Sequence, residues 1–98
     1  MRAALADAGL QSTDIDYINL HGTATPSNDA AEDAAVGKVF GAATPCSSTK
    51  GATGHTLGAA GGVEAAIALL AMRHGLMPAG LNVAQPDPAL HMHYLLGN

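Results

Sequence analysis

Two histidines, His21 and His55, each lie in a loop rich in glycine and threonine, at residues 21–26 and 50–58. Each loop follows a segment with the composition of a strand. Backbone N–H groups and hydroxyls in such loops can contact a ligand closely, and a neutral imidazole can donate a hydrogen bond to a developing oxyanion. The two loops therefore predict proton-transfer or oxyanion chemistry. The alternative is that each is a structural histidine with satisfied ring nitrogens.

Two carboxylates sit on apolar helix patterns and need partners. Glu32 would share a helix face with Val36 and Phe40, which is the face expected to pack inward. Burying an unpaired carboxylate is costly, and Lys50, one of four basic residues, is the expected partner. The alternative is a frayed or rotated helix with Glu32 in solvent. For Glu64, on the next apolar helix, we expect structural pairing.

Three other residues invite a metal or nucleophile hypothesis. His91 and His93 would place both rings on one face of a strand, but no third ligand is apparent nearby, so surface histidines are the better interpretation. Cys46 has no helix N-terminus immediately after it, so we expect a structural cysteine. The glycines after Lys50 fit no nucleotide-binding fingerprint, because the lysine precedes them.

The elements that must position these residues alternate between strands and helices. Ile15–Leu20 alternates apolar and polar residues, which predicts a strand ending at the first histidine. A helix capped by Ser27 or Asn28 is predicted to run to about Phe40, and Cys46–Thr49 forms the next strand. The order predicts an α/β fold with histidines at strand ends. Further helices are expected at residues 1–8 and about 59–74, closed by Gly9 and Gly75, with short strands at 81–83 and 92–96.

Composition excludes several classes of function. The 98 residues suffice for one small domain, and the formal charge of −4 with four scattered basic residues argues against nucleic-acid binding. The longest apolar stretch, Leu57–Met72, contains a glutamate and is shorter than the roughly 18–20 residues that span a bilayer, so we expect a buried helix. A single cysteine fits a reducing compartment, and a cytoplasmic location is expected.

Two long motifs resemble those of one family. His21–Glu32 reads H-G-T-A-T-P-S-N-D-A-A-E, which is similar to the first histidine motif of β-ketoacyl-acyl carrier protein synthases. Ser47–Glu64 reads S-S-T-K-G-A-T-G-H-T-L-G-A-A-G-G-V-E, which is similar to their lysine and second-histidine motif. The chain, residues 1–98, therefore resembles a C-terminal fragment of a type II condensing enzyme from fatty-acid or related polyketide and polyene synthesis.

The resemblance implies a fold and a reaction. The fold is the thiolase-like α/β fold, of which this chain would form most of the C-terminal half, an incomplete α-β-α arrangement. The reaction is a decarboxylative Claisen condensation, in which an acylated cysteine is attacked by the carbanion that malonyl-carrier protein forms on losing carbon dioxide. That cysteine belongs to the first half of the family, and Cys46 does not match its motif. The isolated chain is therefore expected to form no acyl-enzyme.

The resemblance also implies roles for particular residues. His21 and His55 would hold the malonyl thioester carbonyl as neutral N–H donors and stabilise the enolate. A helix that begins just after His55 would help to keep that ring uncharged. Lys50 and Glu32 match the supporting charged pair that orders the site.

Substrates and partners follow in the same way. Thr23 and Thr25 match threonines that hydrogen-bond the phosphopantetheine arm of the acyl carrier protein. No separate cofactor and no metal are implied. The expected partners are the carrier protein and the N-terminal half of the synthase, in a homodimer or heterodimer. Two alternatives are a non-catalytic subunit like a chain-length factor, and a fragment that only binds the carrier protein, for which the chain has few basic residues.

Overall fold

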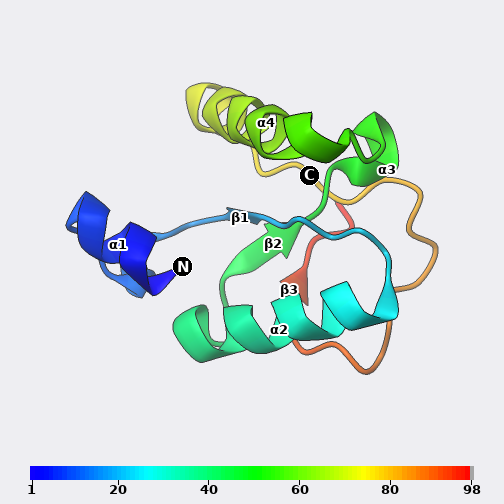
Figure 1. Cartoon of the computed structure of the whole chain (residues 1–98), viewed down its shortest axis with the longest axis horizontal. Coiled ribbons are helices and arrows are strands. Elements are labelled where there is room, and N and C mark those ends of the chain that lie inside the picture. The colour runs from blue at the N-terminus through cyan, green and yellow to red at the C-terminus, as the bar shows by residue number, and fades with distance from the viewer. Residues whose placement is uncertain (98) are drawn as a thin grey trace.

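The computed structural model describes residues 1–97, and its centre is a small parallel sheet. Strands β1 (Ile18–Asn19), β2 (Pro45–Ser47) and β3 (His93–Tyr94) lie in the order β1-β2-β3. Helix α2 (Pro26–Phe40) covers one face, whereas α3 (Lys50–Thr53) and α4 (Ala60–His74) lie on the other (Figure 1). The predicted α/β class and α-β-α layering are confirmed.

Alternation along β1 and β2 divides apolar residues from polar ones. Ile18 pairs with Cys46 and Asn19 with Ser47. Leu20, Val36 and Cys46 form the buried core between the sheet and α2. Asn19 faces the other way, and its amide donates to the Glu64 carbonyl on α4 at 3.3 Å. One face of the sheet is therefore packed, and the opposite face is free to carry polar groups.

Most helix ends lie where the sequence predicts them. Helix α1 (Arg2–Ala8) ends at Gly9 with φ 69°, and α4 ends at Gly75 with φ 61°, both left-handed positions that suit glycine. Helix α2 begins earlier than predicted, with Thr25 as its N-cap and Pro26 in its first turn, where the fixed φ of proline suits a helix start. Two 3₁₀ turns complete the secondary structure, η1 (Ser12–Asp14) and η2 (Leu57–Ala59).

Two local predictions are wrong. Residues 50–53 form helix α3, where a loop was expected. Residues 81–83 form no strand, and residues 81 and 82 form a bend. Asn82 has a φ of 59°, which interrupts an extended run, and its side chain donates to the Gly51 carbonyl at 2.8 Å. The contact with α3 therefore replaces strand pairing in this segment.

The expected burial of the apolar helix is also wrong within this chain. Ala60 and Ala71 of α4 are buried, but Leu69, Leu70 and Met72 are 66%, 54% and 79% exposed. The fully buried residues of the helix are small, Val63 and Ile67 are half-buried, and its larger side chains at positions 69, 70 and 72 face outward. No helix among residues 1–97 is both long and apolar enough to cross a membrane.

Candidate functional site

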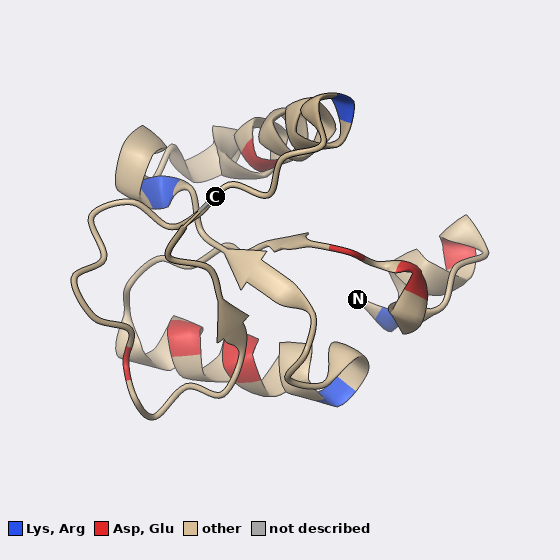
Figure 2. Cartoon of the chain, turned by 180° about the vertical axis from the view of Figure 1, so that it is seen from behind, with Lys and Arg blue, Asp and Glu red and all other residues tan. Residues whose placement is uncertain are grey.

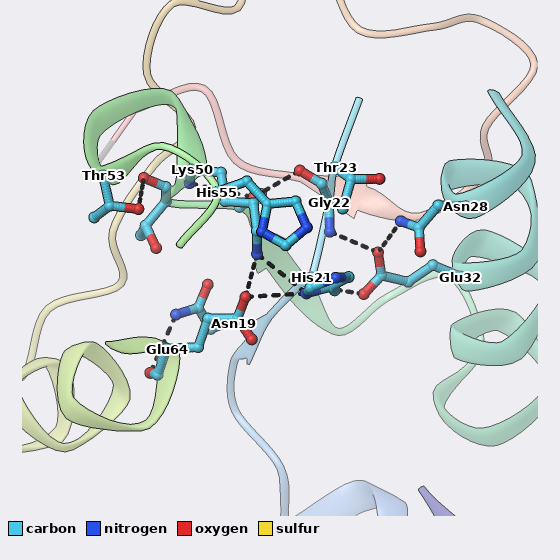
Figure 3. Close-up of polar contacts among 12 residues, drawn as sticks. Asn19, His21, Gly22, Thr23, Asn28, Glu32, Lys50, Thr53, His55 and Glu64 are labelled. Carbon is cyan, nitrogen blue, oxygen red and sulfur yellow. Dashed lines mark hydrogen bonds and ion pairs between the residues drawn. The ribbon is translucent and has the colours of Figure 1, made fainter. Parts of the chain in front are cut away.

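The two loop histidines meet on the α4 side of the sheet. His21 follows β1, and His55 follows α3. Two residues separate the end of β2 from the start of α3. Their ring centroids are 5.2 Å apart, and the rings are perpendicular, edge to face (Figure 3). Chain segments that are 34 residues apart in sequence therefore bring two imidazoles into contact.

A backbone hydrogen bond determines which nitrogen of His55 is free to donate. The N–H of Leu57 donates to His55 Nδ1 at 3.1 Å. Because Nδ1 accepts this bond, Nε2 carries the proton of the neutral ring. The 3₁₀ turn that follows the histidine thus presents Nε2–H as its hydrogen-bond donor.

Lys50, Glu64 and His21 form one polar cluster (Figure 3). Lys50 Nζ donates to Glu64 Oε1 and lies 3.1 Å from His21 Nδ1, while Glu64 Oε1 lies 3.2 Å from the same nitrogen. The side chains of Lys50 and Glu64 are 10% and 20% exposed. Burial would raise the pKa of Glu64, but the hydrogen bond from Lys50 and the contact with His21 outweigh it, so its pKa is lowered.

This cluster corrects the predicted Glu32–Lys50 pair. Lys50 binds Glu64, and Glu32 instead accepts the backbone N–H groups of His21 and Gly22, at 2.7 and 2.8 Å. The prediction of an inward-facing Glu32 is confirmed, but its donors are these backbone groups and, at 3.5 Å, the side-chain amide of Asn28. The structural pairing expected for Glu64 is confirmed, with Lys50 as its partner.

Gly22 lets this loop approach the neighbouring strand. Its φ is 43°, and a Cβ atom there would lie 2.5 Å from Ser48 Cβ. Ser48 Oγ donates to the Gly22 carbonyl at 3.2 Å. Together with Glu32, this bond holds both polar backbone groups of the residue after His21, so the position of the imidazole is fixed from two sides.

A cavity of about 510 Å³ is lined by His55 and by Leu20 and Gly22, the two neighbours of His21 in the chain. Helices α2 and α3 contribute Glu32 and Lys50 to its lining, and the histidine loops contribute Thr23 and His55. A third segment, residues 81–92, supplies apolar and polar groups, including Leu81, Val83, Gln85, Pro86, Leu90 and Met92. The cavity is large enough for an extended small molecule.

The two predicted substrate-binding threonines differ in position. Thr23 lines the cavity, whereas Thr25 is exposed and serves as the N-cap of α2. Their hydroxyls lie 2.8 Å apart and are hydrogen-bonded to each other. Thr23 is therefore the one in direct reach of a bound molecule, and Thr25 can act through it.

Residues with strained backbone conformations lie around the cavity and His55. Among residues 1–97, three residues other than glycine have positive φ: Ala24 at 60°, Leu57 at 52° and Asn82 at 59°. Ala24 and Asn82 line the cavity, and Leu57 supplies the hydrogen bond to His55. Such conformations cost about 1–3 kcal/mol each and cluster at functional sites. Their distribution is independent support for locating the site here.

Cys46 is a core residue, as predicted. It is fully buried against Leu20 and Val36, on the α2 side of the sheet and away from the histidines. Burial, together with the negative charges of Glu32 and Asp33, raises the pKa of its thiol to about 11. Cys46 therefore lacks both access and thiolate character.

We expect native Cys46 to stay unmodified. At pH 8, a thiol with a pKa of about 11 is a thiolate about one part in a thousand. Incubation of the folded chain with an acyl thioester or iodoacetamide should leave its intact mass unchanged, while the same reagents in urea should add one group. A stoichiometric adduct under native conditions would contradict the structural assignment.

The histidines near the C-terminus do not form a metal site. His91 Nδ1 lies 3.3 Å from Asp33 Oδ2, whereas His93 Nδ1 lies 3.2 Å from the carbonyl of Ala43. Within the part of the chain that the structure describes, no three His, Cys, Asp or Glu residues are grouped to hold a metal ion. The expected surface role of these histidines agrees with their exposure.

Two polar residues at the site escape the sequence analysis. Asn19 lies on the same face of β1 as His21, and its buried Oδ1 is without a hydrogen-bond partner among the described residues. The period-two alternation of the strand could have placed it there. Asp33, buried on α2, accepts hydrogen bonds from residues 91 and 92. Sequence gives no signal for such contacts, because the donors are backbone groups 58 and 59 positions away.

Charge on this chain is dominated by acidic groups. Figure 2 shows acidic residues along α2. Arg2 lies beside Lys38 and donates to its backbone carbonyl at 3.5 Å, whereas Lys50 and Arg73 belong to α3 and α4. With four basic residues against eight acidic ones, the chain offers little positive charge to attract an acidic partner.

Comparison with known proteins gives consistent matches. The family "Beta-ketoacyl synthase, C-terminal domain" matches residues 1–84. The mitochondrial 3-oxoacyl-[acyl-carrier-protein] synthase of Arabidopsis thaliana is 47% identical over 97% of this chain and 22% of its own length. A β-ketoacyl synthase structure from Burkholderia phymatum superposes with a TM-score of 0.94 at 41% identity, covering 99% of this chain and 24% of that one.

A solved complex matches equally well. In the complex of a ketosynthase with its chain length factor from Xenorhabdus doucetiae, one chain superposes with a TM-score of 0.92 at 44% identity, covering 99% of this chain and 25% of that one. The 98 residues thus span about a quarter of the length of the proteins they match.

Proposed function

Because the chain belongs to the family of β-ketoacyl synthase C-terminal domains, we propose that it supplies the decarboxylating half of a condensing active site. In this proposal the complete enzyme joins malonyl-carrier protein to an acyl thioester, in fatty-acid or related polyketide and polyene synthesis. His21 and His55 bind the malonyl thioester carbonyl, and Lys50, Glu64 and Glu32 hold the histidines in place. The nucleophilic cysteine comes from residues outside this chain.

The observation that carries the proposal is the contact between the two imidazoles. Leu57 N–H donates to Nδ1 of His55, which leaves Nε2–H as the donor of that neutral ring. Nδ1 of His21 lies 3.1 Å from Lys50 Nζ and 3.2 Å from Glu64 Oε1. In this proposal Nδ1 of His21 accepts from the ammonium group, so that Nε2–H is the donor of the second ring as well. Two such donors are what binding of one oxyanion by two histidines requires.

The proposed reaction is a decarboxylation that forms an enolate, followed by attack of that enolate on an acyl thioester. In the bound malonyl thioester, the bond between the α carbon and the carboxylate breaks, and carbon dioxide leaves. The electron pair moves into the thioester carbonyl as an enolate, whose oxygen accepts the two Nε2–H bonds. The α carbon then attacks the acyl thioester carbonyl, and the cysteine thiolate departs with its electron pair. Neither histidine has to gain or lose a proton in this sequence.

The cavity next to His55 is proposed to hold the phosphopantetheine arm of the carrier protein. Thr23 lines it, as the motif match suggests, and residues 81–92 contribute apolar surface beside the polar histidine loops. No further cofactor enters the proposal. Because this chain offers little positive charge, the docking surface for the carrier protein is assigned to the remainder of the enzyme. A cytoplasmic location stays a prediction.

A graft tests the proposal. Residues 1–97 would replace the matching quarter of the Burkholderia phymatum synthase, and carbon dioxide release from malonyl-carrier protein would be measured. We expect the graft to decarboxylate within about tenfold of the parent enzyme, a difference of about 1.4 kcal/mol in barrier. A graft that unfolds cooperatively like the parent, yet releases no carbon dioxide, would overturn the proposal and favour a non-catalytic subunit.

A further inference from the structure

We infer that Asp33 is a positioning residue for substrate binding, because its carboxylate fastens the end of the segment that forms one wall of the cavity. This inference rests on the proposed function of that cavity. It concerns a residue outside the histidine and lysine cluster, and it assigns a role to a buried charge that the mechanism itself does not use.

The carboxylate of Asp33 is committed to the backbone of this segment. Its Oδ1 accepts the N–H groups of His91 and Met92 at 2.8 and 2.9 Å. The side chain is 11% exposed. Burial would raise the pKa of Asp33, but these two backbone hydrogen bonds and a contact with the His91 ring outweigh it and lower the pKa. The group is therefore ionised at neutral pH and serves as a strong acceptor.

The segment held by Asp33 has few other supports. Between Asn82 and β3, the described chain forms neither helix nor strand. A short turn, in which Ala89 and Leu90 bond to Asp87, gives it local shape. The bond from Asn82 to Gly51 holds one end of the segment, and the two bonds to Asp33 hold the other.

The same segment supplies much of the cavity lining. Residues Val83, Gln85, Pro86, Asp87, Leu90 and Met92 all face the space next to His55. Met92 also packs against the core beside Val36. Loss of the Asp33 anchor would therefore move the cavity wall, while the contacts among His21, Lys50 and Glu64 would remain.

Neighbouring carboxylates of α2 thus perform parallel tasks. Glu32 accepts two consecutive backbone N–H groups in the first histidine loop, and Asp33 accepts two consecutive N–H groups at the start of β3. One turn of helix α2 therefore sets the separation between a histidine loop and the opposite end of the cavity lining. If Asp33 only stabilised the fold, the segment that it anchors would not need to line the cavity proposed for the substrate.

Hydrogen exchange on the full chain tests the anchor. In Asp33→Ala, the amides of His91 and Met92 should exchange at least about tenfold faster, while the Leu95 amide, bonded to the Cys46 carbonyl at 2.8 Å, should keep its protection and report that the sheet is intact. Asp33→Asn retains an Oδ1 acceptor and should restore protection. His91→Ala, which removes only the ring contact, should leave both amides protected.

Binding of malonyl-pantetheine, followed by amide chemical shifts, tests the role in substrate positioning. Asp33→Ala should weaken binding about three- to tenfold, and Asp33→Asn should restore most of it. Unchanged affinity in Asp33→Ala, or unchanged exchange at His91 and Met92, would overturn the inference. If the wild-type chain does not bind the thioester, the substrate role of Asp33 is overturned, whereas the proposed function stands or falls with the graft. The exchange data would still decide whether Asp33 is an anchor.

Discussion

Replacement of His55 with alanine in the grafted synthase is expected to lower the rate of malonyl decarboxylation by about 10²–10³-fold. Removal of one preorganised oxyanion donor costs about this factor in other enzymes. The loss should appear mainly in kcat, because the donor gains strength as negative charge develops on the thioester oxygen. Carbon dioxide release from malonyl-carrier protein under single-turnover conditions measures the step directly. His21→Ala should lower the decarboxylation rate by a similar factor.

The matched control is His74→Ala. His74 lies in the last turn of α4 and is exposed, so its loss should leave the rate within about twofold of the unmodified graft. A double variant, His21→Ala with His55→Ala, should lose little more than either single variant, since two donors to one oxygen act as a unit. If His55→Ala keeps its rate, the role proposed for the imidazole pair is wrong.

The second large effect is expected at the buried ion pair. Loss of one partner from such a pair leaves an uncompensated charge and typically costs about 3–5 kcal/mol. Because the Glu64 side chain is 20% exposed, water recovers part of this, and we expect Lys50→Met or Glu64→Leu alone to cost about 2–3 kcal/mol of unfolding free energy. Urea unfolding of the full chain measures the loss.

The double variant Lys50→Met with Glu64→Leu separates charge from packing. It should recover much of the stability lost in either single variant, because no charge is then left unpaired. Its decarboxylation rate in the graft should stay low, since His21 Nδ1 no longer faces an ammonium donor. Full additivity of the two single stability losses would show that the contact between Lys50 and Glu64 contributes no coupling.

The pair of Lys50 and Glu64 also makes the stability of the fold depend on pH. The pKa of Glu64 in the folded chain is lowered below its ordinary value of 4.5. A depressed carboxyl pKa contributes stability above the unfolded-state pKa, and this contribution is lost as the pH falls through the folded pKa. Asp33 acts in the same direction, because its pKa is also lowered. Acid should therefore weaken the fold below about pH 4.5, and Glu64→Gln should flatten that dependence.

Sequence predicted the features that depend on local pattern. The alternation in residues 15–20 placed a strand before His21, and Gly9 and Gly75 closed their helices as predicted. The order of strands and helices also predicted the α/β fold, with His21 just beyond the end of a strand. In each case the deciding interactions lie within a few residues or follow from the parallel sheet.

What sequence missed depended on which distant groups meet in space. Glu32 and Glu64 were both possible partners for Lys50, and only the packing of α4 on the sheet decides for Glu64. Asp33 was missed because its donors are backbone N–H groups, which every residue type offers except proline. The burial of α4 was mispredicted because an apolar composition cannot show which side of a helix the rest of the protein covers.

Helix α4 links the histidine cluster to the outer surface of this chain. Glu64 contacts Lys50 and His21 on the inner side of the helix. Leu69, Leu70 and Met72 of the same helix are exposed to solvent. Exposed leucines of this kind promote aggregation and are recognised by chaperones and proteases in cells. A product consisting of these 98 residues alone would therefore be short-lived. Cellular quality control, acting on one helix, would therefore remove a half-built catalyst.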